Sequence, residues 1–368
     1  MRKLVKWILY FLALVFSALL AGAYLSRLVS PDKIWQLSFF GLVFPVIFIL
    51  SVILLILLII GRNKAGFLLA AFLVAGWFPI KETVSFIRKT PETQSTEGVK
   101  IMSYNVRIFD NFKWSGKDNS GQMMLDFVAN EKPDIICFQE FMAKSIGDFG
   151  MISIKSKLRH APYVHTKYMR EGLVNKVGLA IFSKYPIIEK GGEYLSDKGQ
   201  LYIYTDLKVK QDTIRLFNIH LESNHFNQSQ INLIDSLISN DPRDKKSEYI
   251  DILKNMKKAY IIRSSQARMI KEVIKESPYP VVVAGDFNDT PVSYTYNTIS
   301  GSLEDAFVGS GKGLGATYKK FMLPLRIDYI LHDKDYQSRE YTKHNVDFSD
   351  HKPIHAVLDI GGFKRKVR

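Results

Sequence analysis

The chain has 368 residues, 47% of them hydrophobic, and a formal net charge of +14, a length that accommodates one large domain and a smaller region. Its single cysteine excludes an internal disulfide framework. Most of the positive charge lies in the first 89 residues, and the 40 basic and 34 acidic residues that follow are too nearly balanced to indicate nucleic-acid binding by charge alone.

Three apolar stretches predict a membrane region over residues 1–89. Residues 4–25 and 37–60 are long enough as helices to cross a hydrocarbon core of about 30 Å. A cleaved signal peptide is the alternative for the first stretch. The third stretch, residues 65–80, is shorter, and it either extends to Ile87 or tilts back as an interfacial segment. The prediction is an integral protein of the cell membrane.

Basic residues predict the orientation of these spans. Five of them precede the first span or fill the short loop between the second and third: Arg2, Lys3, Lys6, Arg62 and Lys64. Because positive loops stay in the cytoplasm, the part of the chain after Lys89 is expected on the non-cytoplasmic side. Arg88 and Lys89, just after the third span, argue for the opposite orientation.

A polar linker over residues 90–98 leads to a predicted soluble domain over 99–361, and a basic tail covers 362–368. Apolar runs predict strands at 99–104, 134–138, 177–182, 201–210, 213–219, 281–285, 326–331 and 353–360, and helices at 120–130 and 260–275. Strands in antiparallel succession that outnumber the helices favour a layered α/β sandwich over a regular βαβ arrangement. Cys137 is expected to be a small buried hydrophobe.

The insertion at 223–258 carries apolar residues at helical spacing between Ile231 and Ile238. This pattern predicts a helix packed on the domain surface. A membrane-facing or substrate-gating element is the alternative.

Polar side chains follow the predicted strands. Asp286 and Asn288 come at the end of the run Val-Val-Val-Ala-Gly, and in extended backbone they project to the same side. A carboxylate beside a carboxamide suits a phosphate held by a hard cation, although an ordinary Asx turn has the same sequence pattern. Six such clusters stand at strand ends: Asn105; Gln139 with Glu140; His220; Asp286 with Asn288; Asp328; and Ser349, Asp350 and His351.

In their order and flanking residues, these six clusters resemble the endonuclease/exonuclease/phosphatase superfamily across residues 99–361. The resemblance implies the four-layer α/β sandwich of deoxyribonuclease I and hydrolysis of a phosphoric ester. It also implies a divalent metal, Mg²⁺ or Mn²⁺, with Glu140 as its main ligand and Asn105 and Asp350 beside it. Hard oxygen ligands are consistent with these ions.

The resemblance also implies the catalytic roles. Asp286 corresponds to the group that orients or deprotonates the attacking water, and Asn288 to one that fixes phosphate or nucleophile. His220 and His351 correspond to histidines that contact the scissile phosphate, and Asp328 to the carboxylate that orients His351. A histidine held by a carboxylate keeps one tautomer, and its cation is stabilised.

Taken together, these patterns predict a membrane-anchored phosphodiesterase that acts on a lipid or envelope component. A linker of about ten residues reaches at most about 35 Å, which keeps the domain near the lipid bilayer, and no duplex-gripping loops can be recognised. A DNA or RNA nuclease, a phosphomonoesterase and an inactive membrane-anchored binding protein are the alternatives. The expected partners are the lipid bilayer and a phosphate-ester substrate, lipid or nucleic acid; no protein partner can be inferred.

Overall fold

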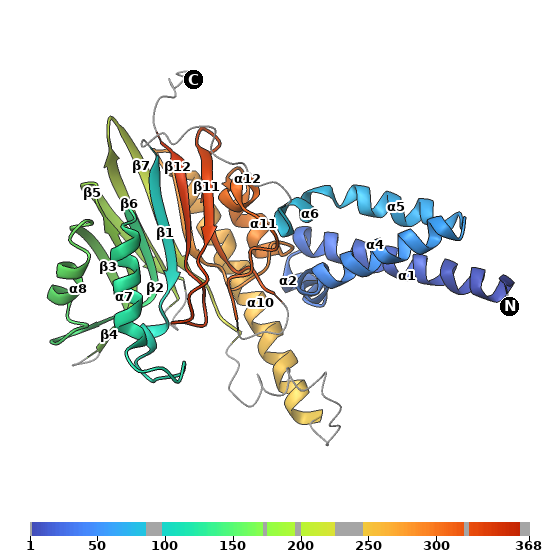
Figure 1. Cartoon of the computed structure of the whole chain (residues 1–368), viewed down its shortest axis with the longest axis horizontal. Helices are drawn as coiled ribbons and strands as arrows, with labels where there is room; N and C mark the ends of the chain where they lie inside the picture. Colours follow the sequence, from blue (N-terminus) through green and yellow to red (C-terminus); the bar gives the residue numbers. More distant parts are fainter. Residues whose placement is uncertain are drawn as a thin grey trace. The chain divides into compact units, whose positions relative to one another are not determined.

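The computed structural model of the protein describes residues 2–85, 98–171, 175–195, 200–224, 246–319 and 324–360 (Figure 1). The chain divides into two compact units. The helical unit comprises Met1–Val84, Asn224–Arg268 and Asp289–Ile299, and the sandwich unit comprises Ser85–Ser223, Met269–Asn288 and Ser300–Arg368. Residues 90–97 of the predicted linker, the amphipathic segment 231–238 and the basic tail lie outside the described residues.

The helical unit buries an apolar core and exposes further apolar side chains. Leu20, Phe44 and Leu58 are fully buried, whereas Trp7 is 74% exposed and Phe67 is 80% exposed. Its helices are α1 (Arg2–Leu28), α2 (Pro31–Ile34), α3 (Leu37–Leu42), α4 (Phe44–Ile60), α5 (Ala65–Ala75), α6 (Trp77–Thr83), most of α11 (Tyr294–Ser300) and the first part of α10 (Lys246–Lys275).

One described helix, α1, is long and apolar enough by itself to cross a membrane, over Leu4–Leu28. Helices α5 and α6 pass the same test only together, and they are bent by 62° relative to one another. The predicted second span is broken at Val43, because Pro45 has no backbone N–H and therefore lies in the first turn of a new helix, α4. Length and composition thus support one of the three predicted spans, or two if the bent pair is one span.

Segments from beyond residue 99 complete the helical unit. The ring of Tyr260 on α10 packs edge-on against Phe39, with ring centroids 5.7 Å apart. The Ser26 hydroxyl donates to the Val292 carbonyl at 3.0 Å. The described residues 246–268 and 289–299 therefore belong to the same compact unit as the N-terminal helices.

The sandwich unit contains two six-stranded mixed sheets that form an α/β sandwich of the deoxyribonuclease I type (Figure 1). The first sheet has the order β11-β12-β1-β2-β4-β3, with β1 (Val99–Asn105), β2 (Ile135–Lys144), β3 (Tyr163–Glu171), β4 (Asn175–Ser183), β11 (Gln337–Lys343) and β12 (Ile354–Asp359). The second has the order β5-β6-β7-β8-β10-β9, with β5 (Ile187–Tyr194), β6 (Leu201–Val209), β7 (Asp212–His220), β8 (Val281–Asp286), β9 (Glu304–Asp305) and β10 (Asp328–His332). The strands β1 and β2 are parallel, as are β7 and β8.

Alternation along the strands separates two apolar layers. Ile101 and Cys137 join the core between the sheets, and the full burial of Cys137 confirms its prediction as a buried hydrophobe. Their neighbours Met102 and Ile136 point the other way and pack with side chains of α7 (Ser120–Glu131) and α8 (Met151–Lys157). The unit also contains η1 (Arg107–Asp110) and α12 (Ala306–Ser310).

Gly285 lets β8 lie close to β7 next to the strand end. Its φ is +149°, and a Cβ at this position would meet the Ile219 carbonyl oxygen at 2.1 Å. A larger residue would therefore push the two strands apart one residue before Asp286.

Candidate active site

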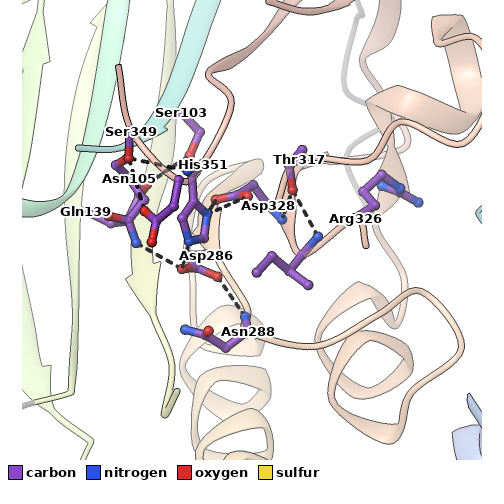
Figure 2. Close-up of polar contacts among 12 residues, drawn as sticks. Ser103, Asn105, Gln139, Asp286, Asn288, Thr317, Arg326, Asp328, Ser349 and His351 are labelled. Atoms are coloured by element: carbon purple, nitrogen blue, oxygen red, sulfur yellow. Dashed lines mark hydrogen bonds and ion pairs between the residues drawn. The ribbon is translucent and has the colours of Figure 1, made fainter. Parts of the chain in front are cut away.

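The same alternation brings the predicted polar residues to one end of the sandwich. In β1, the inward-facing Ile101 is followed by Asn105 four residues later, so both side chains share one face. In β8, the inward-facing Ala284 is likewise followed by Asp286. The Asn105 side-chain amide donates to the Asp286 carboxylate at 3.0 Å and joins the two sheets (Figure 2).

Strand register places three of the candidate side chains in a row on the second sheet. His220, the last residue of β7, lies opposite Asp286 in the parallel pair, and Asp328, the first residue of β10, lies opposite Asp286 in the antiparallel pair. Opposed residues project to the same face of a sheet. A histidine and a second carboxylate therefore flank Asp286 on neighbouring strands.

A bulge in β2 separates the roles of Gln139 and Glu140. The register against β4 shifts between Phe138 and Phe141, and Glu140 has φ +48°, a left-handed conformation that costs about 1–3 kcal/mol. Gln139 is fully buried and donates to Asn218 of the second sheet at 2.7 Å. Glu140 instead accepts from the Asn105 amide at 3.3 Å, and 30% of its side chain is exposed.

Asp286 is buried between two imidazoles. Its Oδ2 lies 3.8 Å from Nε2 of His220 and 3.7 Å from Nε2 of His351. Its Oδ1 accepts the backbone N–H of Asn288 at 2.8 Å. Burial raises the pKa of Asp286 above its usual range, although the two histidines oppose this shift. The carboxylate is thus placed to accept a proton.

His351 lies beside the Asp328 carboxylate. Its Nδ1 lies 3.0 Å and 3.2 Å from the two Asp328 oxygens (Figure 2). Burial opposes protonation of the ring, but Asp328 and Asp286 outweigh it and raise the pKa of His351 to about 10. The ring is therefore cationic at neutral pH, with Nδ1–H directed to Asp328 and Nε2–H facing Asp286.

Two supporting residues were not predicted. The Thr317 hydroxyl oxygen accepts the backbone N–H of Asp328 at 3.2 Å (Figure 2). Arg107 follows Asn105 in a turn of four consecutive left-handed residues, 107–110, and its Nε lies 3.2 Å from Asp350. A charged residue two positions after the predicted Asn105 was the available signal for Arg107, whereas Thr317 has no sequence signal.

The remaining predicted residues contact backbone or neighbouring side chains. The Asn288 amide donates to the Leu221 carbonyl at 3.0 Å, and Asn288 itself has φ +52°. Asp350 pairs with Arg107 and accepts from the Ser349 hydroxyl at 3.3 Å. Contacts link seven of the eight predicted residues directly: Asn105, Glu140, His220, Asp286, Asn288, Asp328 and His351. The roles of all eight remain predictions.

The charges of this cluster fit a divalent cation. Among the described residues, the carboxylates of the cluster outnumber its cationic side chains. The carboxylates are those of Glu140, Asp286, Asp328 and Asp350, and the cations are Arg107 and His351. A bound divalent ion compensates such an excess of negative charge, so the residues present fit the implied metal.

The two-sheet sandwich thus carries a histidine–carboxylate pair and a buried aspartate together at one rim. The sequence profile of the Endonuclease/Exonuclease/phosphatase family matches residues 102–351, and the chain belongs to this family, whose members hydrolyse phosphoester bonds. A profile for a domain of unknown function (DUF8431) matches residues 6–83. No curated protein matches the sequence.

Several solved structures share the fold. An endonuclease/exonuclease/phosphatase family protein from Bacteroides thetaiotaomicron is 18% identical, covers 71% of this chain and 94% of its own, and has a TM-score of 0.50. The corresponding protein from Beutenbergia cavernae is 17% identical, covers 72% of each chain and has a TM-score of 0.50. Humanized D. rerio TDP2 is 16% identical, covers 72% of this chain and 100% of its own, and has a TM-score of 0.50. At these identities the likeness concerns the fold alone.

Proposed function

We propose that the protein is a membrane-anchored, divalent-metal-dependent phosphodiesterase that acts on a lipid or envelope component. The observation that carries the catalytic part is the position of the Asp286 carboxylate, 3.7–3.8 Å from Nε2 of both His220 and His351. This arrangement places a proton acceptor beside a cationic imidazole, the two groups that in-line attack of water on phosphorus requires.

Each side chain has a distinct role in this mechanism. Asp286 orients the attacking water and accepts its proton, and Asn105 holds the carboxylate in place through a 3.0 Å hydrogen bond. The His351 imidazolium, fixed by Asp328, offsets the negative charge that develops on the phosphoryl oxygens. A divalent ion held by Glu140, Asn105 and Asp350 supplies Lewis-acid polarisation of the phosphate when bound.

Metal dependence gives one direct test. A chelator is expected to abolish turnover, and added Mg²⁺ or Mn²⁺ to restore it. Glu140→Gln is expected to weaken metal binding by at least about tenfold, and more than any other single change, because it removes the carboxylate that Asn105 holds at the site. Calorimetric titration of the full chain measures this affinity.

The matched control for this test is Glu193→Gln, which removes an exposed carboxylate from β5. Its metal affinity should equal that of the wild type. Hydrolysis that persists in excess chelator, or equal affinities for the two glutamate variants, contradicts the assigned metal site.

The membrane part of the proposal rests on the helical unit. Helix α1 is long and apolar enough to span a bilayer, and exposed apolar side chains continue over the other helices, with Ile60 at 74% and Val74 at 76% exposure. Exposure of so many apolar side chains to water is unfavourable, whereas the hydrocarbon core of a bilayer accommodates them. The side of the membrane on which the sandwich unit lies stays a prediction from the charges of the loops.

Membrane anchoring predicts the preferred substrate. A phosphodiester presented in a liposome meets the anchored site at high effective concentration, so the full-length protein reconstituted in liposomes should cleave it at least about a hundredfold faster than a short-chain soluble analogue with the same head group. The measurement compares both rates with the nicking of plasmid DNA by the same preparation.

Asp286→Asn serves as the control, because its loss of activity ties each reaction to the proposed site. Efficient DNA nicking without lipid turnover would identify the protein as a nuclease. Release of phosphate from monoesters alone would identify a phosphomonoesterase, and no hydrolysis of any phosphoester would indicate a binding protein.

A further inference from the structure

A second cluster of histidines and carboxylates lies on the helix-covered face of the first sheet. His355 is opposite Met102 in the β1–β12 pair, and Met102 packs under α7. His344 follows β11, and its ring packs edge-on against Phe127 of α7, with centroids 4.9 Å apart. Glu131, the last residue of α7, completes the cluster. None of these residues takes part in the proposed phosphoesterase chemistry.

The two imidazoles are in direct contact. Nε2 of His344 lies 2.7 Å from Nδ1 of His355, and it lies 3.9 Å from Oε2 of Glu131. One ligand atom from each of the three residues lies within 4.8 Å of the others. The side chains of His344 and His355 are 13% and 6% exposed, so solvent screens the pair only weakly.

A carboxylate on the far side of His355 fixes its tautomer. Nε2 of His355 lies 3.3 Å from Oε1 of Glu340, and a carboxylate can only accept, so Nε2 carries the proton. Nδ1 of His355 is therefore an unprotonated nitrogen directed at His344. Metal-binding histidines are characteristically held this way, with the second ring nitrogen donating to a carboxylate.

The charges around the pair leave room for a cation. Among the described residues, two carboxylates, Glu131 and Glu340, lie beside the imidazoles, and the ammonium group of Lys100 pairs with one of them, its Nζ lying 2.8 Å from Oε2 of Glu131.

We propose that Glu131, His344 and His355 form a binding site for a divalent transition-metal ion of the Zn²⁺ class. Two imidazole nitrogens and one carboxylate oxygen are the donor set that such an ion prefers, whereas Mg²⁺ prefers the oxygen-rich set at the active site. Binding moves the proton of His344 from Nε2 to Nδ1 and draws Glu131 away from Lys100. The ion then ties the end of α7 to β11 and β12.

Competition between Lys100 and the ion gives the sharpest test. The full-length protein, purified without a histidine tag and stripped of metal, is titrated with Zn²⁺ in excess Mg²⁺, which saturates the oxygen site. One equivalent of Zn²⁺ is expected to bind, and Co²⁺ in its place should show the visible absorption of a low-coordinate nitrogen-ligated site. Lys100→Met is expected to bind Zn²⁺ at least about tenfold more tightly, because the competing ammonium is gone. A solely structural network would lose stability in this variant and gain no affinity.

Ligand variants complete the test. His355→Ala and His344→Ala should no longer bind the one equivalent of Zn²⁺ that the wild type binds in excess Mg²⁺. Glu340→Gln should lower the affinity for this Zn²⁺ about tenfold, although it removes no ligand. His160→Ala removes a half-buried histidine elsewhere in the unit and should bind as the wild type does. Wild-type protein that binds no Zn²⁺ in excess Mg²⁺ overturns the proposal, as does equal binding by the wild type, His355→Ala and Glu340→Gln.

Discussion

Replacing Asp286 with asparagine is expected to lower kcat by at least about a hundredfold, the contribution typical of a removed acid–base group. The substitution keeps the size of the side chain and an oxygen that can accept the Asn288 N–H, but it removes the negative charge that lies between His220 and His351. The measurement is turnover of a confirmed phosphoester substrate by the full-length protein, with thermal unfolding as the check on the fold.

Asp335→Asn is the matched control, because Asp335 is an exposed aspartate in the turn between β10 and β11. Its kcat should be that of the wild type. A rate for Asp286→Asn close to the control, measured on folded protein, would mean that another group activates the water and that the assigned centre is wrong.

The central strands could be predicted from the sequence, and the edge strands could not. All eight predicted strands are present, and the predicted pairing of 201–210 with 213–219 is confirmed as β6 with β7. The four strands that were missed, β3, β5, β9 and β11, are the four edges of the two sheets. Edge strands face solvent and carry charged residues, as in Gln-Ser-Arg-Glu-Tyr-Thr-Lys of β11, so they lack the apolar alternation that reveals a buried strand.

Strand periodicity predicts the positions of only part of the candidate site, and the other residues were predicted from the family resemblance. Asn105, His220 and Asp286 end strands whose inward-facing residues are apolar, so their place at the rim follows from a period of two. Arg107 reaches Asp350 through a left-handed turn, and local sequence does not specify such a turn in residues other than glycine. The approach of residues 289–299 to the N-terminal helices depends on contacts distant in sequence, and no local pattern encodes them.

The second large loss of kcat is expected when His351 is replaced. His351→Ala should lower kcat by at least about a hundredfold, because it removes the cation that offsets charge on the phosphoryl group. Asp328→Asn should lower kcat less, because the His351 ring remains. The ring loses only the carboxylate whose Oδ2 lies 3.0 Å from Nδ1 of His351 and which stabilises the imidazolium. Both rates are measured on the full-length protein at saturating substrate.

The double variant distinguishes the two roles open to Asp328. If Asp328 acts only through His351, the double variant Asp328→Asn/His351→Ala should be no slower than His351→Ala alone, since a residue that orients an absent ring has no further effect. Ligand atoms of Asp328, Asp286 and His351 lie within 4.8 Å of one another, so direct participation in metal binding is the competing role of Asp328. Multiplicative losses in the double variant, together with weaker metal affinity in Asp328→Asn, would establish that competing role and remove Asp328 from the histidine pair.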